Sequence, residues 1–186
     1  MTSKIIENTI FYLFLFLPVS LLLGTLVSEL SMILICLLFI YYSFAVKNFE
    51  WIKSQDCKVL LILYFILIVN LIFSEDKSLS LLRNAGFIKY IIFVFAVKKI
   101  IIEKTDFFNK ILLFWSAIFL LTIFDLYYEH IFGKNTLGFQ TKYPARLVGF
   151  LGEENKIGTF IIGFLFPITF FWFYRLFEKT SGKKIF

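Results

Sequence analysis

Charged residues are scarce in this chain. Only 17% of its 186 residues are Asp, Glu, Lys or Arg, whereas 60% are hydrophobic. A soluble domain of this length cannot hide so much apolar surface, because its exterior must be largely polar. The composition therefore excludes a soluble globular protein and predicts an all-α integral membrane protein, since helices satisfy their own backbone groups in lipid.

Cysteine and histidine are equally scarce. Cys36 lies inside an apolar run and Cys57 in a short loop, so the two cysteines predict neither a disulfide framework nor a metal site. The single histidine, His130, follows Tyr127 and Tyr128, where an interfacial role is favoured over catalysis. No spacing of serine, cysteine and histidine indicates a nucleophile, and neither a metal nor a cofactor is expected.

Long apolar runs are abundant. A spanning helix needs about 20 mostly apolar residues, and six segments qualify or come close. The first run has no small-residue cleavage site after it, so we interpret it as a retained helix rather than a signal peptide. No soluble domain is apparent, and residues 1–186 are expected to form one polytopic membrane domain. The six predicted spans are residues 10–26, 32–46, 59–73, 85–102, 111–128 and 158–176.

The net charge of +6 is better explained by membrane topology than by nucleic-acid binding, because the lysines lie between apolar runs and do not form a basic stripe. With the N-terminus inside, twelve basic residues fall on the inner segments and six on the outer loops, while Lys89 lies within a span. This bias in basic residues predicts that both termini lie in the cytoplasm and that the loop over residues 129–157 faces outward. We therefore expect a multi-pass protein of the bacterial inner membrane.

The outward loop ends in YPARLVGFLGEENKIGTF, residues 143–160. The planar guanidinium of Arg146 suits a phosphate or pyrophosphate at a membrane surface. Gly149 and Gly152 let the backbone turn sharply or approach a ligand. Glu153 and Glu154 either orient Arg146 or act as a base. Alternatively, this stretch is a solvated turn that caps the sixth helix, the favoured interpretation for the two glutamates but not for Arg146.

Three further charged residues have two interpretations each. Lys89 lies about one turn inside the fourth span, where it is either a functional cation or a residue that snorkels to the interface. Both interpretations place its ammonium near the outer headgroups, where a lipid phosphate would lie. Arg83 ends the stretch SEDKSLSLLRN, either a short interfacial helix or a wet hairpin. Asp125, near the end of the fifth span, is either buried against a partner such as Arg146 or marks the wet end of the helix.

Residues 124–167, FDLYYEHIFGKNTLGFQTKYPARLVGFLGEENKIGTFIIGFLFP, resemble the bacterial O-antigen ligase and O-antigen polymerase family. In that family an acidic residue ends a span and an aromatic stretch follows it. Two motifs come next, G-x-x-x-x-G and then R-x-x-G-x-x-G-[DE]-E, and a small residue begins the next helix. Residues 73–97 also resemble the family's outer loop and following helix. The matching positions are Asp125, Tyr127, Tyr128, Gly133, Gly138, Arg146, Gly149, Gly152, Glu153, Glu154, Gly158 and, upstream, Lys89.

The resemblance implies metal-independent transfer of a glycan from an undecaprenyl-diphosphate carrier. The acceptor sugar would be lipid A-core for a ligase and a lipid-linked repeat unit for a polymerase. Members carry about twice as many spans, and in the ligases a large periplasmic loop of the second half carries a functional histidine, so this chain is expected to correspond to their N-terminal half. The implied site has Arg146 as the catalytic residue and, in substrate binding, Lys89, Arg83, Gly149, Gly152, Glu153 and Glu154.

The alternative function is a non-catalytic membrane protein, a transporter component or assembly partner that binds membrane lipid headgroups through the outward loop. A transporter would place polar residues at mid-span on several helices. Here only Asn70 and Thr122, with small residues such as Ser116, lie deep within predicted spans. That scarcity counts against a conduction path.

Overall fold

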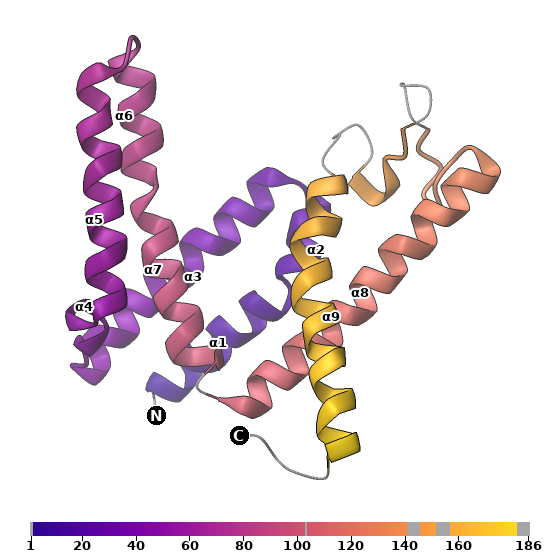
Figure 1. The fold of residues 1–186 in the computed structure, drawn as a ribbon, viewed down its shortest axis with the longest axis horizontal. Helices are drawn as coiled ribbons and strands as arrows, with labels where there is room; N and C mark the ends of the chain where they lie inside the picture. The colour runs from indigo at the N-terminus through magenta and orange to yellow at the C-terminus, as the bar shows by residue number, and fades with distance from the viewer. Residues whose placement is uncertain (1, 103, 141–145, 152–156, 182–186) are drawn as a thin grey trace. The chain divides into compact units, whose positions relative to one another are not determined.

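The structure is a computed structural model that describes residues 2–102, 104–140, 146–151 and 157–181. Within these ranges the chain forms helices joined by loops, as Figure 1 shows, which confirms the all-helical expectation. The elements in chain order are α1 Thr2–Leu15, α2 Leu17–Leu23, α3 Thr25–Val46, α4 Glu50–Lys53, α5 Gln55–Asn70, η1 Leu71–Phe73, α6 Lys77–Gly86, α7 Ile88–Val97, η2 Lys98–Ile102, α8 Thr105–Phe132, η3 Gly149–Leu151 and α9 Ile157–Ser181.

Several helices are long and apolar enough to cross a membrane. Among the described residues there are four by length and composition, or up to five if one bent helix pair counts as a span. They coincide with four of the predicted spans, so a membrane protein is supported by the fold as well as by composition. The four segments are Thr25–Val46, Gln55–Phe73, Asp106–Phe132 and Ile157–Phe177.

The predicted first span is a bent pair. Ser3–Leu15 and Leu17–Leu23 meet at 50°, and Pro18 lies in the first turn of α2. A proline there lacks the backbone donor that would continue the preceding helix, but it is well tolerated at a helix start. Gly24, with φ +129°, then separates α2 from α3.

The predicted fourth span, residues 85–102, is divided among three elements. It begins in the last turn of α6, continues through α7 and ends in the π-helical turn η2. At 1.5 Å per residue, the ten residues of α7 extend only about 15 Å, well short of a hydrocarbon core of roughly 30 Å. This segment is therefore not among the helices that qualify, and the count of six spans stays a prediction.

The chain divides into two compact units, of which unit 1 comprises Met1–Phe14 and Glu29–Phe107. Within it, Tyr42 donates a hydrogen bond of 2.8 Å to Glu7, and Lys104 pairs with the same carboxylate. The rings of Phe11 and Phe107 lie 4.4 Å apart. These contacts join α1, the C-terminal half of α3 and the segment after η2.

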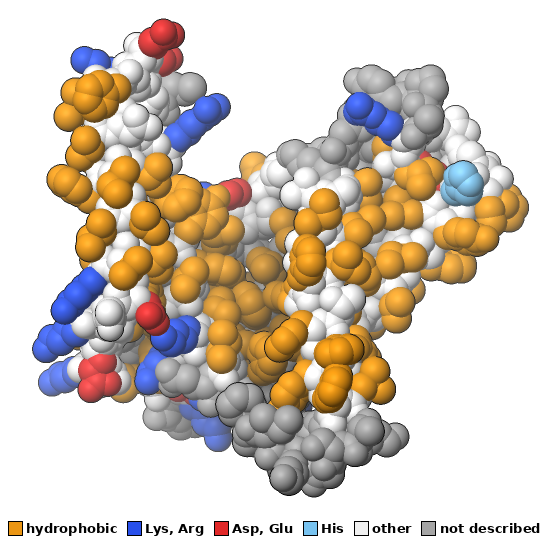
Figure 2. Space-filling model, viewed as in Figure 1, with side chains coloured by type: hydrophobic (Ala, Val, Ile, Leu, Met, Phe, Trp, Pro, Cys, Tyr) orange, Lys and Arg blue, Asp and Glu red, His pale blue; other side chains and the backbone are white. Residues whose placement is uncertain are grey.

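Helices α5 and α6 of unit 1 run side by side as a hairpin (Figure 1). The Asn84 amide donates to the Leu67 carbonyl at 2.9 Å, and Ser74 and Ser80 share a hydrogen bond of 2.5 Å at the turn. In Figure 2 the charged side chains of this hairpin gather at its two ends and leave a hydrophobic middle. Such a distribution is typical of helices that cross lipid.

Unit 2 comprises Leu15–Ser28 and Phe108–Phe186. Its core joins α8 to α9, because Trp115 packs edge-on against Phe164 with ring centroids 5.0 Å apart. The Trp172 indole donates to Ser116 at 3.0 Å, and the Trp115 indole donates to the Leu15 carbonyl at 3.1 Å. Both indole N–H groups thus have hydrogen-bond partners, and that of the buried Trp115 needs one because it is shielded from water.

Candidate functional site

The loop that follows α8 in unit 2 is held by a buried carboxylate in the last turn of that helix. The Glu129 side chain accepts hydrogen bonds from the backbone N–H of Val148, at 3.0 and 3.1 Å, and of Gly149, at 2.7 Å. Glu129 is only 3% exposed. Hydrogen bonds to an ionised carboxylate are among the stronger ones, so Glu129 fixes the start of η3 against α8.

A second buried carboxylate lies one turn earlier on α8. Asp125 is fully buried, and its Oδ1 accepts from the Thr136 backbone N–H at 2.9 Å and from the Thr136 hydroxyl at 2.5 Å. Its Oδ2 has no hydrogen-bond partner among the described residues. The interpretation of Asp125 as the wet end of the helix is therefore wrong, because the carboxylate is enclosed and holds the loop.

Asn135 organises the turn between α8 and η3. Its side-chain oxygen accepts from Leu137 N–H at 3.1 Å and Phe139 N–H at 2.7 Å, while its amide donates to the Gly149 carbonyl at 2.6 Å. Gly138, with φ +86°, closes the turn by donating to the Asn135 carbonyl. The loop therefore has an internal framework of hydrogen bonds.

Gly149 meets two constraints at once. Its φ of +54° lies in the left-handed region, which side chains with a Cβ rarely adopt. A Cβ built there would lie 3.0 Å from Leu126 Cδ2, so α8 also occupies the space. Of the roles expected for this glycine, a sharp turn is confirmed, and the close approach is to α8 itself.

Arg146 is exposed and lies two residues before the anchored Val148. The remaining residues of the predicted motif, Gly152, Glu153 and Glu154, lie outside the described residues. The described part of the loop therefore presents a guanidinium from a backbone that is fixed immediately beyond it.

The two upstream basic residues belong to unit 1. Lys89 pairs with Glu29 of α3, its ammonium lies 5.1 Å from the centre of the Tyr90 ring, and its carbonyl accepts from Cys36. Pairing is thus the way this cation is accommodated. Arg83 is exposed and lies in the helix α6, which forms a hairpin with α5. Unit 1 thus carries Lys89 and Arg83, and unit 2 carries Arg146 and Gly149.

Sequence analysis missed the residues that support the loop: Glu129, Asn135 and Thr136. A signal for Glu129 was present, since it lies four residues after Asp125 and therefore on the same helix face. Thr122, fully buried one turn before Asp125, continues that face. The hydrogen bonds of Asn135 and Thr136 depend on the loop conformation and have no such signature.

Among the described residues no three His, Cys, Asp or Glu side chains are grouped to hold a metal ion. Comparisons of the chain with protein-family models, curated proteins and solved structures find no significant match. Function is therefore inferred from the site's own geometry and from the motif in the sequence.

Proposed function

We propose that this chain is a multi-pass protein of the bacterial inner membrane that takes part in glycan transfer from an undecaprenyl-diphosphate carrier, of the O-antigen ligase or polymerase type. In this proposal six spans place both termini in the cytoplasm and the loop over residues 129–157 outside. The observation that carries it is an exposed Arg146 on a loop whose backbone is fixed by the buried carboxylate of Glu129.

A fixed loop favours ligand binding because less conformational entropy is lost when the complex forms. A guanidinium can make two parallel hydrogen bonds to a diphosphate, which a lysine ammonium cannot. The loop is followed by α9, whose Ile157–Phe177 segment could span a membrane, so Arg146 lies eleven positions before a candidate span. The diphosphate of a polyprenyl carrier is expected at that membrane surface.

The other motif residues have supporting roles in the proposal. Gly149 would keep the turn that presents Arg146. Lys89 and Arg83 belong to unit 1, and their part in substrate binding stays a prediction. Gly152, Glu153 and Glu154 would complete the loop on its α9 side. The acceptor would be lipid A-core or a second lipid-linked repeat unit.

The test is binding of an undecaprenyl-diphosphate-linked glycan to the purified chain in lipid nanodiscs. Replacing Arg146 by alanine should weaken binding about ten- to hundredfold, as expected for the loss of one charge-assisted contact of about 1.5–3 kcal/mol. Arg146→Lys should be nearly as harmful, since it loses the bidentate geometry. Lys134→Ala removes an exposed charge from the same loop and should have little effect.

Equal binding by the wild type and Arg146→Ala would remove Arg146 from the site. A loss of equal size in Lys134→Ala would show that only the total loop charge matters, which would also contradict the proposal.

One observation favours the alternative of a non-catalytic protein that binds lipid headgroups through this loop. Both carboxylates at the described end of α8, Asp125 and Glu129, are buried and accept hydrogen bonds from the loop. Neither is therefore placed to exchange protons with a substrate at the surface. Binding of the carrier without glycan transfer, in cells that supply donor and acceptor, would select this alternative.

A further inference from the structure

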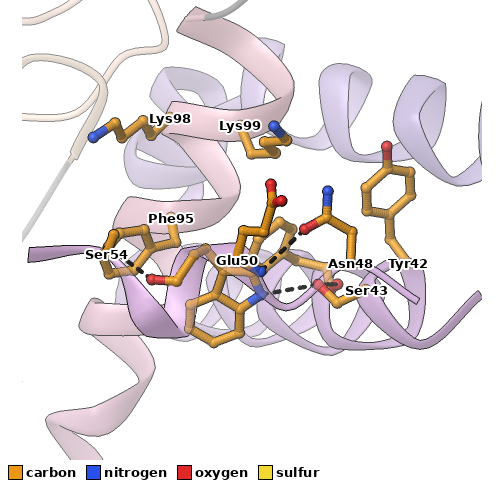
Figure 3. Close-up of a pocket in the computed structure, with 10 residues that line it drawn as sticks. Tyr42, Ser43, Asn48, Glu50, Ser54, Phe95, Lys98 and Lys99 are labelled. Atoms are coloured by element: carbon orange, nitrogen blue, oxygen red, sulfur yellow. Dashed lines mark hydrogen bonds between the residues drawn. The ribbon is translucent and has the colours of Figure 1, made fainter. Parts of the chain in front are cut away.

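A cavity of about 190 Å³ opens at one end of unit 1. It lies between the last turns of α3, the short helix α4 and the junction of α7 with η2, and Figure 3 shows the side chains around it. Its volume exceeds what a single water molecule needs. Because α4 lies between the candidate spans Thr25–Val46 and Gln55–Phe73, the cavity opens where the chain turns at a membrane surface.

One wall of the cavity is aromatic and held in place. The Trp51 ring lies 5.5 Å from that of Phe39 and 5.4 Å from that of Phe95. The Trp51 indole donates to the hydroxyl of the buried Ser43 at 3.2 Å. The indole therefore has its polar partner inside the protein, and its ring offers an apolar face that also attracts cations.

The lining carries charges of both signs. Lys98 extends away from the cavity in Figure 3 and pairs with Asp56 at 2.5 Å. Lys99 and the Glu50 carboxylate lie on the same side of the cavity. Asn48 accepts from the Glu50 backbone N–H at 3.1 Å, and its amide nitrogen faces the same side. A ligand here meets a cation, a carboxylate and an amide donor over an aromatic wall.

We propose that this cavity binds the phosphoethanolamine headgroup of a membrane phospholipid. The phosphate accepts hydrogen bonds from Lys99 and the Asn48 amide, while the primary ammonium donates to Glu50 and lies against the Trp51 ring. A headgroup that carries only negative charge would be repelled by the nearby Glu50 carboxylate. A quaternary ammonium cannot donate a hydrogen bond to Glu50. The lining therefore favours a headgroup that has both a phosphate and a primary amine.

The test measures lipid retained by the purified full chain in native mass spectrometry after exchange into mixed vesicles. Phosphatidylethanolamine should be retained about tenfold over phosphatidylcholine and phosphatidylglycerol. Lys99→Gln, which removes the positive charge, and Glu50→Gln, which preserves side-chain size, should each reduce that preference about tenfold. Lys58→Gln removes an exposed charge of α5 outside the cavity and should leave the preference unchanged. Thermal unfolding of each variant in detergent controls for folding.

Three outcomes would overturn the proposal. One is a preference that survives both Lys99→Gln and Glu50→Gln. Another is stronger retention of phosphatidylglycerol, increased further by Glu50→Gln, which would indicate a site for anionic lipid. The third is binding of free O-phosphoethanolamine as tight as that of the lipid, because the ligand would then be a soluble phosphoamine. Trp51 fluorescence, followed with Trp115 and Trp172 replaced by phenylalanine, gives an independent readout of occupancy.

Discussion

At the scale of single residues, two buried acids of α8 hold the loop that follows this helix. Glu129 accepts from two backbone N–H groups, and Asp125 accepts twice from Thr136. A buried donor that loses its acceptor lowers the free energy of unfolding by more than the intact hydrogen bond had added to it. The positions of these two acids on α8 therefore decide whether the loop has one conformation.

We predict that Glu129→Ala lowers the free energy of unfolding by about 1–3 kcal/mol, because the N–H groups of Val148 and Gly149 lose their acceptor. Thermal unfolding of the purified chain in detergent measures the effect. The neighbouring exposed His130 is the matched control, and His130→Ala should change stability by less than about 0.5 kcal/mol. Similar effects for the two variants would mean that Glu129 does not anchor the loop.

The ion pair between Lys89 and Glu29 in unit 1 gives a second prediction at the scale of residues. Each single variant, Lys89→Met or Glu29→Gln, leaves one charge without its partner, and the double variant removes both. We expect a coupling energy of about 0.5–1 kcal/mol in a double-mutant cycle, modest because the Glu29 side chain is 42% exposed. Strictly additive unfolding free energies would show that the pair contributes nothing to stability.

At the scale of elements, η3 is shaped by its packing against α8. The left-handed backbone of Gly149 disfavours any side chain, and a Cβ there would make a tight contact of 3.0 Å with Leu126. We predict that Gly149→Ala destabilises the chain by about 1–2 kcal/mol, the cost of a non-glycine residue in that conformation. The measurement is the midpoint of thermal unfolding in detergent.

Gly158 provides the comparison for Gly149. It lies in the first turn of α9, and a Cβ there would meet nothing within 4 Å. Gly158→Ala should be neutral or stabilising by up to about 1 kcal/mol, because alanine favours helix over glycine. Equal destabilisation by both substitutions would contradict the role assigned to the Gly149 turn.

At the scale of the whole molecule, the open question is which ends of the helices face the cytoplasm. Cysteine labelling tests it on a background in which Cys36 and Cys57 are replaced by alanine. The exposed Gln140, in the loop after α8, should react as cysteine with a membrane-impermeant maleimide in intact cells. Gln55, exposed at the start of α5, should react only after the membrane is opened. Labelling of the Gln55 position in intact cells would overturn the predicted topology.

The helical membrane class followed from composition alone, because so large an apolar fraction leaves lipid-facing helices as the available solution. Four predicted spans reappear as long helices for the same reason. The sequence also located the loop of Arg146, since charge and glycine gather there between two apolar runs. It did not reveal the broken segments. Residues 85–102 are divided among three elements and the first predicted span is bent by 50° next to Pro18, although both segments are mostly apolar in sequence.

The sequence by itself determined that this chain is helical, apolar enough for a membrane and carries an arginine motif between two candidate spans. Only the tertiary structure decided that Glu129 and Asp125 hold the loop, that Lys89 pairs with Glu29, and that a lined cavity lies beside Trp51. The physical reason is that the need to bury apolar side chains in lipid depends on composition, which can be counted from the sequence. A hydrogen bond or ion pair depends on two groups distant in sequence meeting within about 3 Å, which only the folded backbone can arrange.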